Sequence, residues 1–165
     1  PLLRKAGLEL VYVGVESSSH VVLKDMKRFT VEHDKQYKVI KKCEDAGIKV
    51  KTMFIIGNPE DTRDTIIQSI EYSKYLPSLY SQFSVFTPYP GTPVYSEFKD
   101  IITETKLENF NQYNLTFEHK NLTNKDISNL KSLAYFRFYF NFKKIIQILK
   151  YFIQSKYEKV HKRVG

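Results

Sequence analysis

The chain lacks features on which several classes of protein depend. Its single cysteine, Cys43, excludes a disulfide framework and any metal or cluster site made from several thiolates of this chain. The chain contains no run of eighteen apolar residues, so its sequence predicts no transmembrane helix. Residues 1–7 have neither the long apolar stretch nor the small-residue cleavage site of a signal peptide. We therefore expect a cytoplasmic protein.

The chain also lacks the common residue patterns of hydrolytic and metal-dependent enzymes. Its four histidines are scattered without ligand spacing, and no Ser/His/Asp, Cys/His or paired-carboxylate arrangement stands out. Residues 57–62 (Gly-Asn-Pro-Glu-Asp-Thr) lack the glycine spacing and the lysine of a phosphate-binding loop. A tight turn in which Asp61 or Thr62 caps the next helix explains this segment without a ligand.

The net charge of +8 is not spread evenly along the chain. Residues 120–165 hold eleven lysines and arginines against Asp126 and Glu158, a net +9, whereas the first 119 residues carry −1. The basic charge thus belongs to the C-terminal region. An AT-rich genome would favour lysine without any polyanionic partner, so this charge alone does not predict nucleic-acid binding.

With 165 residues, 42% of them apolar, the chain can bury one core of ordinary size. Short apolar runs at residues 8–15, 48–56 and 80–87 predict buried strands. Helical spacing predicts helices between them, one starting near Thr30 and ending at Gly47, and one over residues 62–75. Strands that alternate with helices indicate an α/β fold with a parallel sheet.

The C-terminal third has a different pattern. We expect residues 1–100 to form the α/β unit, residues 101–122 an irregular connector, and residues 123–165 a basic amphipathic helical region with a break at Asn141. Its apolar positions favour packing against the α/β unit over contact with a membrane surface, although a basic amphipathic helix can do either. Those positions are Leu130, Leu133, Phe136 and Phe140, followed by Ile145, Ile146, Leu149, Phe152 and Ile153.

Ligands of parallel α/β sheets bind at the carboxyl ends of the strands, which directs attention to three short segments. They are residues 14–17, 57–62 and 87–93. Glu16 closes an apolar strand, where a carboxylate is costly to bury without a partner or a ligand. An ion pair with a neighbouring lysine, or a cap of the next turn, would explain Glu16 equally well.

The segments at the strand ends closely resemble, in kind, order and spacing, the second half of a radical S-adenosylmethionine (SAM) catalytic domain. The resemblance is greatest to the cobalamin-binding branch that includes anaerobic magnesium-protoporphyrin monomethyl ester cyclases and radical methyltransferases. It covers residues 2–98 and extends more loosely to the helices after 123. It rests on Leu3-Arg4-Lys5-Ala6-Gly7, Val13-Gly14-Val15-Glu16-Ser17-Ser18-Ser19, Val22-Leu23-Lys24-Asp25-Met26, Ala46-Gly47-Ile48, Phe54-Ile55-Ile56-Gly57-Asn58-Pro59 and Phe86-Thr87-Pro88-Tyr89-Pro90-Gly91-Thr92-Pro93-Val94-Tyr95.

This resemblance implies the last three βα units of a partial (β/α)6 TIM-like barrel that binds SAM. It assigns Glu16, with Ser17 beside it, to the ribose or aminoacyl part of SAM, where a carboxylate suits hydroxyls and an ammonium group. The segment from Ile55 through Gly57 to Pro59 is expected to pack on the adenine. The segment Phe86, Thr87 and Pro88 is expected to line the same pocket. No catalytic or metal-binding residue is assigned within the chain.

The family's iron-sulfur cluster needs a Cys-x-x-x-Cys-x-x-Cys loop, which this chain does not contain. We therefore expect a fragment whose partner is a missing N-terminal half that carries the 4Fe–4S cluster, and expect the isolated chain to be inactive. Ser18 stands where the family has a glycine, and the turn at residues 57–62 departs from the usual Gly-Leu-Pro-Gly-Glu-Thr. Cobalamin is implied only by the sub-branch, and the substrate is unknown.

The alternative hypothesis is a non-catalytic half-barrel module. Its basic aromatic tail, residues 120–165, would bind a membrane surface or a nucleic acid. Within the radical SAM interpretation, we expect no nucleic-acid partner but keep contact with a membrane surface open.

Overall fold

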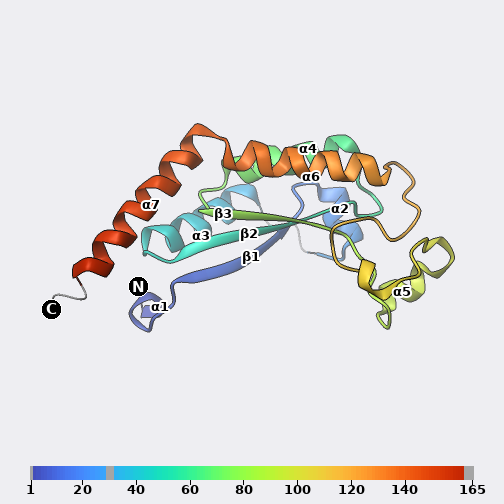
Figure 1. Ribbon diagram of the computed structural model, residues 1–165, viewed down its shortest axis with the longest axis horizontal. Coiled ribbons are helices and arrows are strands. Elements are labelled where there is room, and N and C mark those ends of the chain that lie inside the picture. Colours follow the sequence, from blue (N-terminus) through green and yellow to red (C-terminus); the bar gives the residue numbers. More distant parts are fainter. Residues whose placement is uncertain (1, 29–31, 162–165) are drawn as a thin grey trace.

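Three parallel strands form a sheet with the order β1-β2-β3 in the computed structural model, which describes residues 2–28 and 32–161, with side chains to residue 153 (Figure 1). The strands are β1 (Leu10–Glu16), β2 (Lys49–Ile56) and β3 (Tyr80–Val85). An α/β fold with a parallel sheet was predicted and is confirmed. The observed β3 ends two residues before the predicted strand over residues 80–87. The observed β1 begins two residues after the predicted strand over residues 8–15 and includes Glu16.

Two long helices lie between the strands: one ends, and the other begins, where the sequence predicted. Helix α3 (His33–Asp45) follows β1 and stops before Gly47, which has a φ of +79°. Helix α4 (Arg63–Tyr75) starts at Thr62, whose side chain accepts a hydrogen bond from the Thr65 N–H. This cap confirms one of the two predicted for the turn. The predicted N-cap of α3, Thr30, lies outside the described residues.

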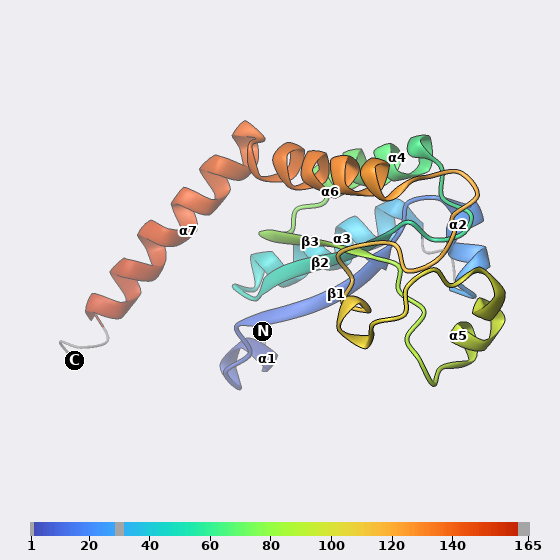
Figure 2. The same cartoon turned by 45° about the vertical axis from the view of Figure 1, so that its right-hand side comes forward.

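The remaining elements are short, except for two C-terminal helices. They are α1 (Leu2–Lys5), α2 (His20–Asp25), α5 (Pro93–Glu97), the 3-10 turns Lys99–Ile101 and Leu107–Asn109, α6 (Asn124–Tyr139) and α7 (Phe142–His161). The predicted break at Asn141 lies between α6 and α7. As Figure 2 shows, α7 turns away from the direction of α6 at this point.

The core lies between the sheet and helices α3, α4 and α6. Burial alternates along β2: Val50, Thr52, Phe54 and Ile56 are buried, whereas the residues between them are half-buried. Period-2 alternation places those buried residues on the helix-covered face. The opposite face carries Lys51 and Met53 and is less covered.

The C-terminal helices pack differently from the prediction. Helix α6 buries Ile127, Leu130, Ala134 and Phe138. Of the four predicted positions, Leu130 lies in the core, Leu133 is half-buried, and Phe136 and Phe140 are exposed. Helix α7 is held by Lys144, which is buried and donates to the carbonyls of Leu76 and Ser78. Its apolar stripe is exposed at Ile145, Leu149, Phe152 and Ile153. The prediction that this stripe packs against the α/β unit was therefore wrong.

Candidate functional site

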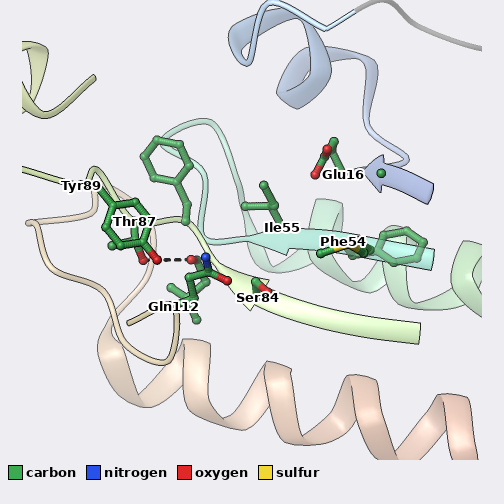
Figure 3. A pocket seen from close by; sticks show the side chains of 11 residues that line it. Glu16, Phe54, Ile55, Ser84, Thr87, Tyr89 and Gln112 are labelled. Carbon is green, nitrogen blue, oxygen red and sulfur yellow. Dashed lines mark hydrogen bonds between the residues drawn. The ribbon is translucent and has the colours of Figure 1, made fainter. Parts of the chain in front are cut away.

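A cavity of about 300 Å³ opens at the carboxyl ends of the three strands (Figure 3). All three strands contribute to this strand-end cavity, together with the segments after β3. Its volume is at the lower end of the range for small-molecule sites, which often lie at strand ends in such folds. Its lining residues are Gly14, Glu16, Met53, Phe54, Ile55, Ser84, Val85, Phe86, Thr87, Tyr89 and Gln112.

The backbone of Glu16 aims its carboxylate into this cavity. The register of β1 against β2 shifts between Gly14 and Glu16, and Glu16 has a φ of +65°. The N–H of Ser17 donates to the carbonyl of Val15 (2.9 Å) and closes a three-residue turn around Glu16. A Cβ atom at Gly14 would lie 2.5 Å from Glu16 Oε1, so the carboxylate occupies the space that a side chain at position 14 would fill.

The carboxylate of Glu16 is mostly shielded from water, although it has an ionic partner. Its side chain is 13% exposed, and Oε1 lies 3.3 Å from Nη2 of Arg28, which is 61% exposed. Burial raises the pKa of Glu16 above its ordinary value, and the nearby Arg28 only partly offsets this effect. One exposed arginine leaves the carboxylate able to accept hydrogen bonds from a ligand.

Apolar groups form the part of the cavity between the strands. Ile55 projects from β2, and Phe86 follows β3 and packs against Phe98 and Phe117 at ring-centroid distances of 5.7 and 5.9 Å. The Thr87 hydroxyl donates to the Val85 carbonyl (3.1 Å), which fixes the chain beyond β3. A flat, weakly polar ring system fits such a surface.

The structure brings Glu16, Ile55, Phe86 and Thr87 together around the cavity and places the other four predicted contact residues outside its lining. Ser17 is buried against Ser69, with an Oγ to Oγ distance of 3.2 Å. Gly57 lies beneath Leu115 and Ile127. Pro59 belongs to the turn after β2, and Pro88 is buried. Contact of all eight residues with SAM stays a prediction.

The turn after β2 is held by a network that the sequence did not suggest. Asp61 is buried, and its carboxylate accepts from the Asn58 N–H (3.0 Å) and the Thr65 hydroxyl (2.6 Å). His119 Nδ1 accepts from the N–H groups of Asn121 and Leu122, so its proton is on Nε2 and is donated to the Asn58 carbonyl (2.8 Å). This turn is therefore tied to the segment before α6.

Asp61 should make the stability of the protein depend on pH. Burial raises its pKa from 3.8 to about 6. Because the folded state binds this proton more tightly, the contribution of Asp61 to stability is complete below about pH 4 and is lost as the pH rises to 6, by roughly 2–3 kcal/mol. We expect Asp61→Asn to gain stability relative to the wild type over that window, measured by urea unfolding at pH 4.5 and 7. The exposed neighbour Asp64→Asn is the control, and a pH-independent difference for Asp61→Asn would contradict this assignment.

Sequence reasoning missed four polar or sulfur-containing residues that line the cavity: Met53, Ser84, Tyr89 and Gln112. Alternation within β2 and β3 could have placed Met53 and Ser84 on the same face as Ile55. Tyr89 lies within residues 87–93, one of the three segments expected at the carboxyl ends of the strands. Gln112 lies in a segment without periodicity, and no sequence signal identified it.

Within residues 2–28 and 32–161, no group of three or more His, Cys, Asp or Glu side chains could hold a metal ion. Cys43 is half-buried in α3 and packs against the core. None of the helices in the part that the structure describes is long and apolar enough to cross a membrane.

The sequence is similar to a known protein family and to several enzymes. Residues 1–73 match the Radical SAM superfamily. An uncharacterized methyltransferase of Pyrococcus horikoshii is 28% identical over 147 residues, covering 88% of this chain and 32% of that protein. The bacteriochlorophyllide d C-12(1)-methyltransferase of Chlorobaculum tepidum is 26% identical over 73% of this chain and 26% of its own length.

A third relative is the anaerobic magnesium-protoporphyrin IX monomethyl ester cyclase of Rubrivivax gelatinosus, 29% identical over 67% of this chain and 20% of its own. The chain thus spans about a third or less of the length of these curated relatives. Residues 1–73 are thus similar to the Radical SAM superfamily, and the relatives that match more of the chain are methyltransferases and a cyclase.

Proposed function

We propose that this chain is the SAM-binding part of a radical SAM enzyme. The observation that carries the proposal is the position of the Glu16 carboxylate beside the apolar residues Ile55 and Phe86 in one strand-end cavity. A buried carboxylate can accept hydrogen bonds from ribose hydroxyls or from the ammonium group of SAM. The apolar residues offer a surface for the adenine ring. The residues present therefore fit the nucleoside and part of the amino acid.

The chain supplies the last three βα units of a partial (β/α)6 barrel in this proposal. The 4Fe–4S cluster must be held elsewhere, because one cysteine cannot provide three thiolate ligands. A reduced cluster held there would supply the electron for cleavage of SAM to a 5′-deoxyadenosyl radical, which would then modify a substrate. The residues of this chain bind and orient SAM and exclude water from the cavity.

The relatives suggest which reaction follows. Two bacteriochlorophyllide d methyltransferases and two magnesium-protoporphyrin IX monomethyl ester cyclases are among them. We infer methylation, cyclisation or a related modification of an organic substrate, with cobalamin as a further cofactor suggested by the branch. The substrate is not assigned by any residue of the strand-end cavity.

The coding sequence upstream of Pro1 tests this proposal. We expect it to encode, in frame and within about 250 codons, a Cys-x-x-x-Cys-x-x-Cys loop directly after a strand. A cobalamin-type domain farther upstream would support the use of that cofactor. A start codon within a few residues of Pro1, with no cysteine triad before it, would contradict the proposal.

A second candidate function is contact with an anionic membrane surface through α7. The observation that favours it is the exposed stripe of Ile145, Leu149, Phe152 and Ile153 on a helix that also carries exposed Lys143 and Lys150. Amphipathic helices of this composition bind lipid interfaces. We expect the protein to float with phosphatidylglycerol vesicles at low salt but not with phosphatidylcholine vesicles.

The same vesicle measurement needs a matched pair of variants. Leu149→Asp should abolish flotation, whereas Leu107→Asp should not, because Leu107 is also an exposed leucine but lies far along the chain from α7. No flotation of the wild type, or equal flotation of both variants, would exclude this contact.

A further inference from the structure

Gln112 occupies a backbone conformation that its residue type rarely adopts. Three described residues other than glycine have a positive φ: Glu16 (+65°), Lys27 (+54°) and Gln112 (+66°). Lys27 follows the end of α2, where the N–H of Arg28 donates to the carbonyl of Leu23, and a positive φ is ordinary after a helix. Glu16 and Gln112 do not follow the end of a helix in this way, and both line the strand-end cavity. Strained residues of this kind concentrate at ligand sites.

The backbone of Gln112 is fixed from two sides. Its carbonyl accepts from the Val85 N–H (2.9 Å), so position 112 extends the hydrogen bonding of the sheet beyond β3. The same carbonyl accepts from Lys131 Nζ (3.2 Å), which also lies 4.4 Å from the ring centroid of Tyr113. These contacts hold the residue in its strained conformation and fix the point from which its side chain enters the cavity.

The side-chain amide of Gln112 is available to a ligand. Within the described residues it makes no hydrogen bond, whereas the hydroxyls of Thr87 and Ser84 each take part in one. The Thr87 hydroxyl donates to the Val85 carbonyl, and the Ser84 hydroxyl accepts from the Gln82 amide (3.2 Å). Gln112 therefore offers one acceptor and two donors at the β3 side of the cavity.

The order of the lining residues across the sheet defines how a ligand can lie. Glu16 ends β1, Ile55 lies near the end of β2, and Gln112 lies beyond β3. Figure 3 shows Ile55 between Glu16 on one side and Thr87, Tyr89 and Gln112 on the other. A molecule that places its ribose at Glu16 and a flat base over Ile55 directs the far edge of that base toward Gln112.

We propose that Gln112 determines base specificity by hydrogen bonding to the amino edge of the adenine of SAM. Its carbonyl oxygen would accept from the exocyclic amine, and its NH2 group would donate to the adjacent ring nitrogen, a pairing for which glutamine is well suited. The inference rests on the proposed function, since it takes SAM as the occupant. It adds a specificity residue from a segment outside the superfamily match.

The test is a binding measurement rather than an activity assay. The full-length protein with its cluster assembled is titrated calorimetrically, without reductant, with SAM and with an analogue whose purine lacks the 6-amino group. We expect the wild type to prefer SAM by about tenfold, the scale of one or two hydrogen bonds. Gln112→Ala should lower the affinity for SAM more than the affinity for the analogue, which lacks only the hydrogen bond of the amine, so the preference falls to about onefold.

Asn114→Ala removes an exposed amide two residues away and should keep the wild-type preference. An undiminished preference in Gln112→Ala, or no preference in the wild type, would overturn the role of Gln112 and leave SAM binding intact. A wild type that binds neither compound would overturn the proposed function as well. Thermal unfolding of Gln112→Ala separates a loss of contact from misfolding, and Gln112→Gly, which relieves the positive φ, should show the same loss of preference in a fully folded protein.

Discussion

Glu16→Gln should lower the affinity of the full-length protein for SAM by about 10- to 100-fold. A hydrogen bond to a charged acceptor contributes about 1.5–3 kcal/mol, and glutamine keeps the size of the side chain while removing its charge. The affinity of the wild type should also fall on acidification, as the carboxylate is protonated. Because burial raises the pKa of Glu16, this loss should begin at a higher pH than for an exposed glutamate. Calorimetric titrations with SAM from pH 5 to 8 measure both effects.

Glu9→Gln is the matched control for this variant. Glu9 directly precedes β1, and its side chain is 78% exposed and 3.7 Å from Arg4. Its substitution should change neither the affinity for SAM nor its pH dependence. Equal affinities of the wild type and Glu16→Gln would exclude Glu16 as a ligand of SAM.

Gly57→Leu should lower the free energy of unfolding by about 4 kcal/mol, from overpacking together with the strain of a positive φ. Gly57 directly follows β2 and has a φ of +76°, and a Cβ atom there would lie 3.1 Å from both Ile127 Cδ1 and Leu115 Cδ2. A leucine would force α6 and the segment before it away from the sheet. Because that segment follows Gln112, we also expect SAM binding to weaken.

Gly91→Leu separates the two causes. Gly91 has a φ of +85°, but no atom lies within 4 Å of a Cβ built there. Its substitution should cost only about 1 kcal/mol, from backbone strain alone. Urea unfolding of both variants measures the difference, and equal losses would show that the contact with Leu115 and Ile127 does not limit position 57.

The sequence predicted the sheet well because its signals are local. Apolar runs marked the three strands, Gly47 marked the end of α3, and Thr62 marked the start of α4. Once the strands were predicted, Glu16, Ile55, Phe86 and Thr87 could also be assigned to one edge of the sheet, because each lies at or near the carboxyl end of a strand. Parallel strands joined by helices all end on the same side.

The remaining features depend on tertiary contacts. Apolar residues lie on more than one face of α6, so helical spacing could not show that Phe138 is buried and Phe136 exposed. The positive φ of Glu16 comes from a shift in strand register, which a strand pattern does not reveal. Gln112 reaches the cavity because its carbonyl pairs with Val85, a contact between distant segments.

The central claim is that this chain provides the SAM site of a radical enzyme and depends on a cluster held by another segment. Formation of 5′-deoxyadenosine from SAM with a strong reductant under anaerobic conditions tests it most directly. The full-length protein with its cluster should form 5′-deoxyadenosine, and residues 1–165 alone should form none. No product from the cluster-loaded full-length protein, or reproducible product from residues 1–165 alone, would contradict the claim.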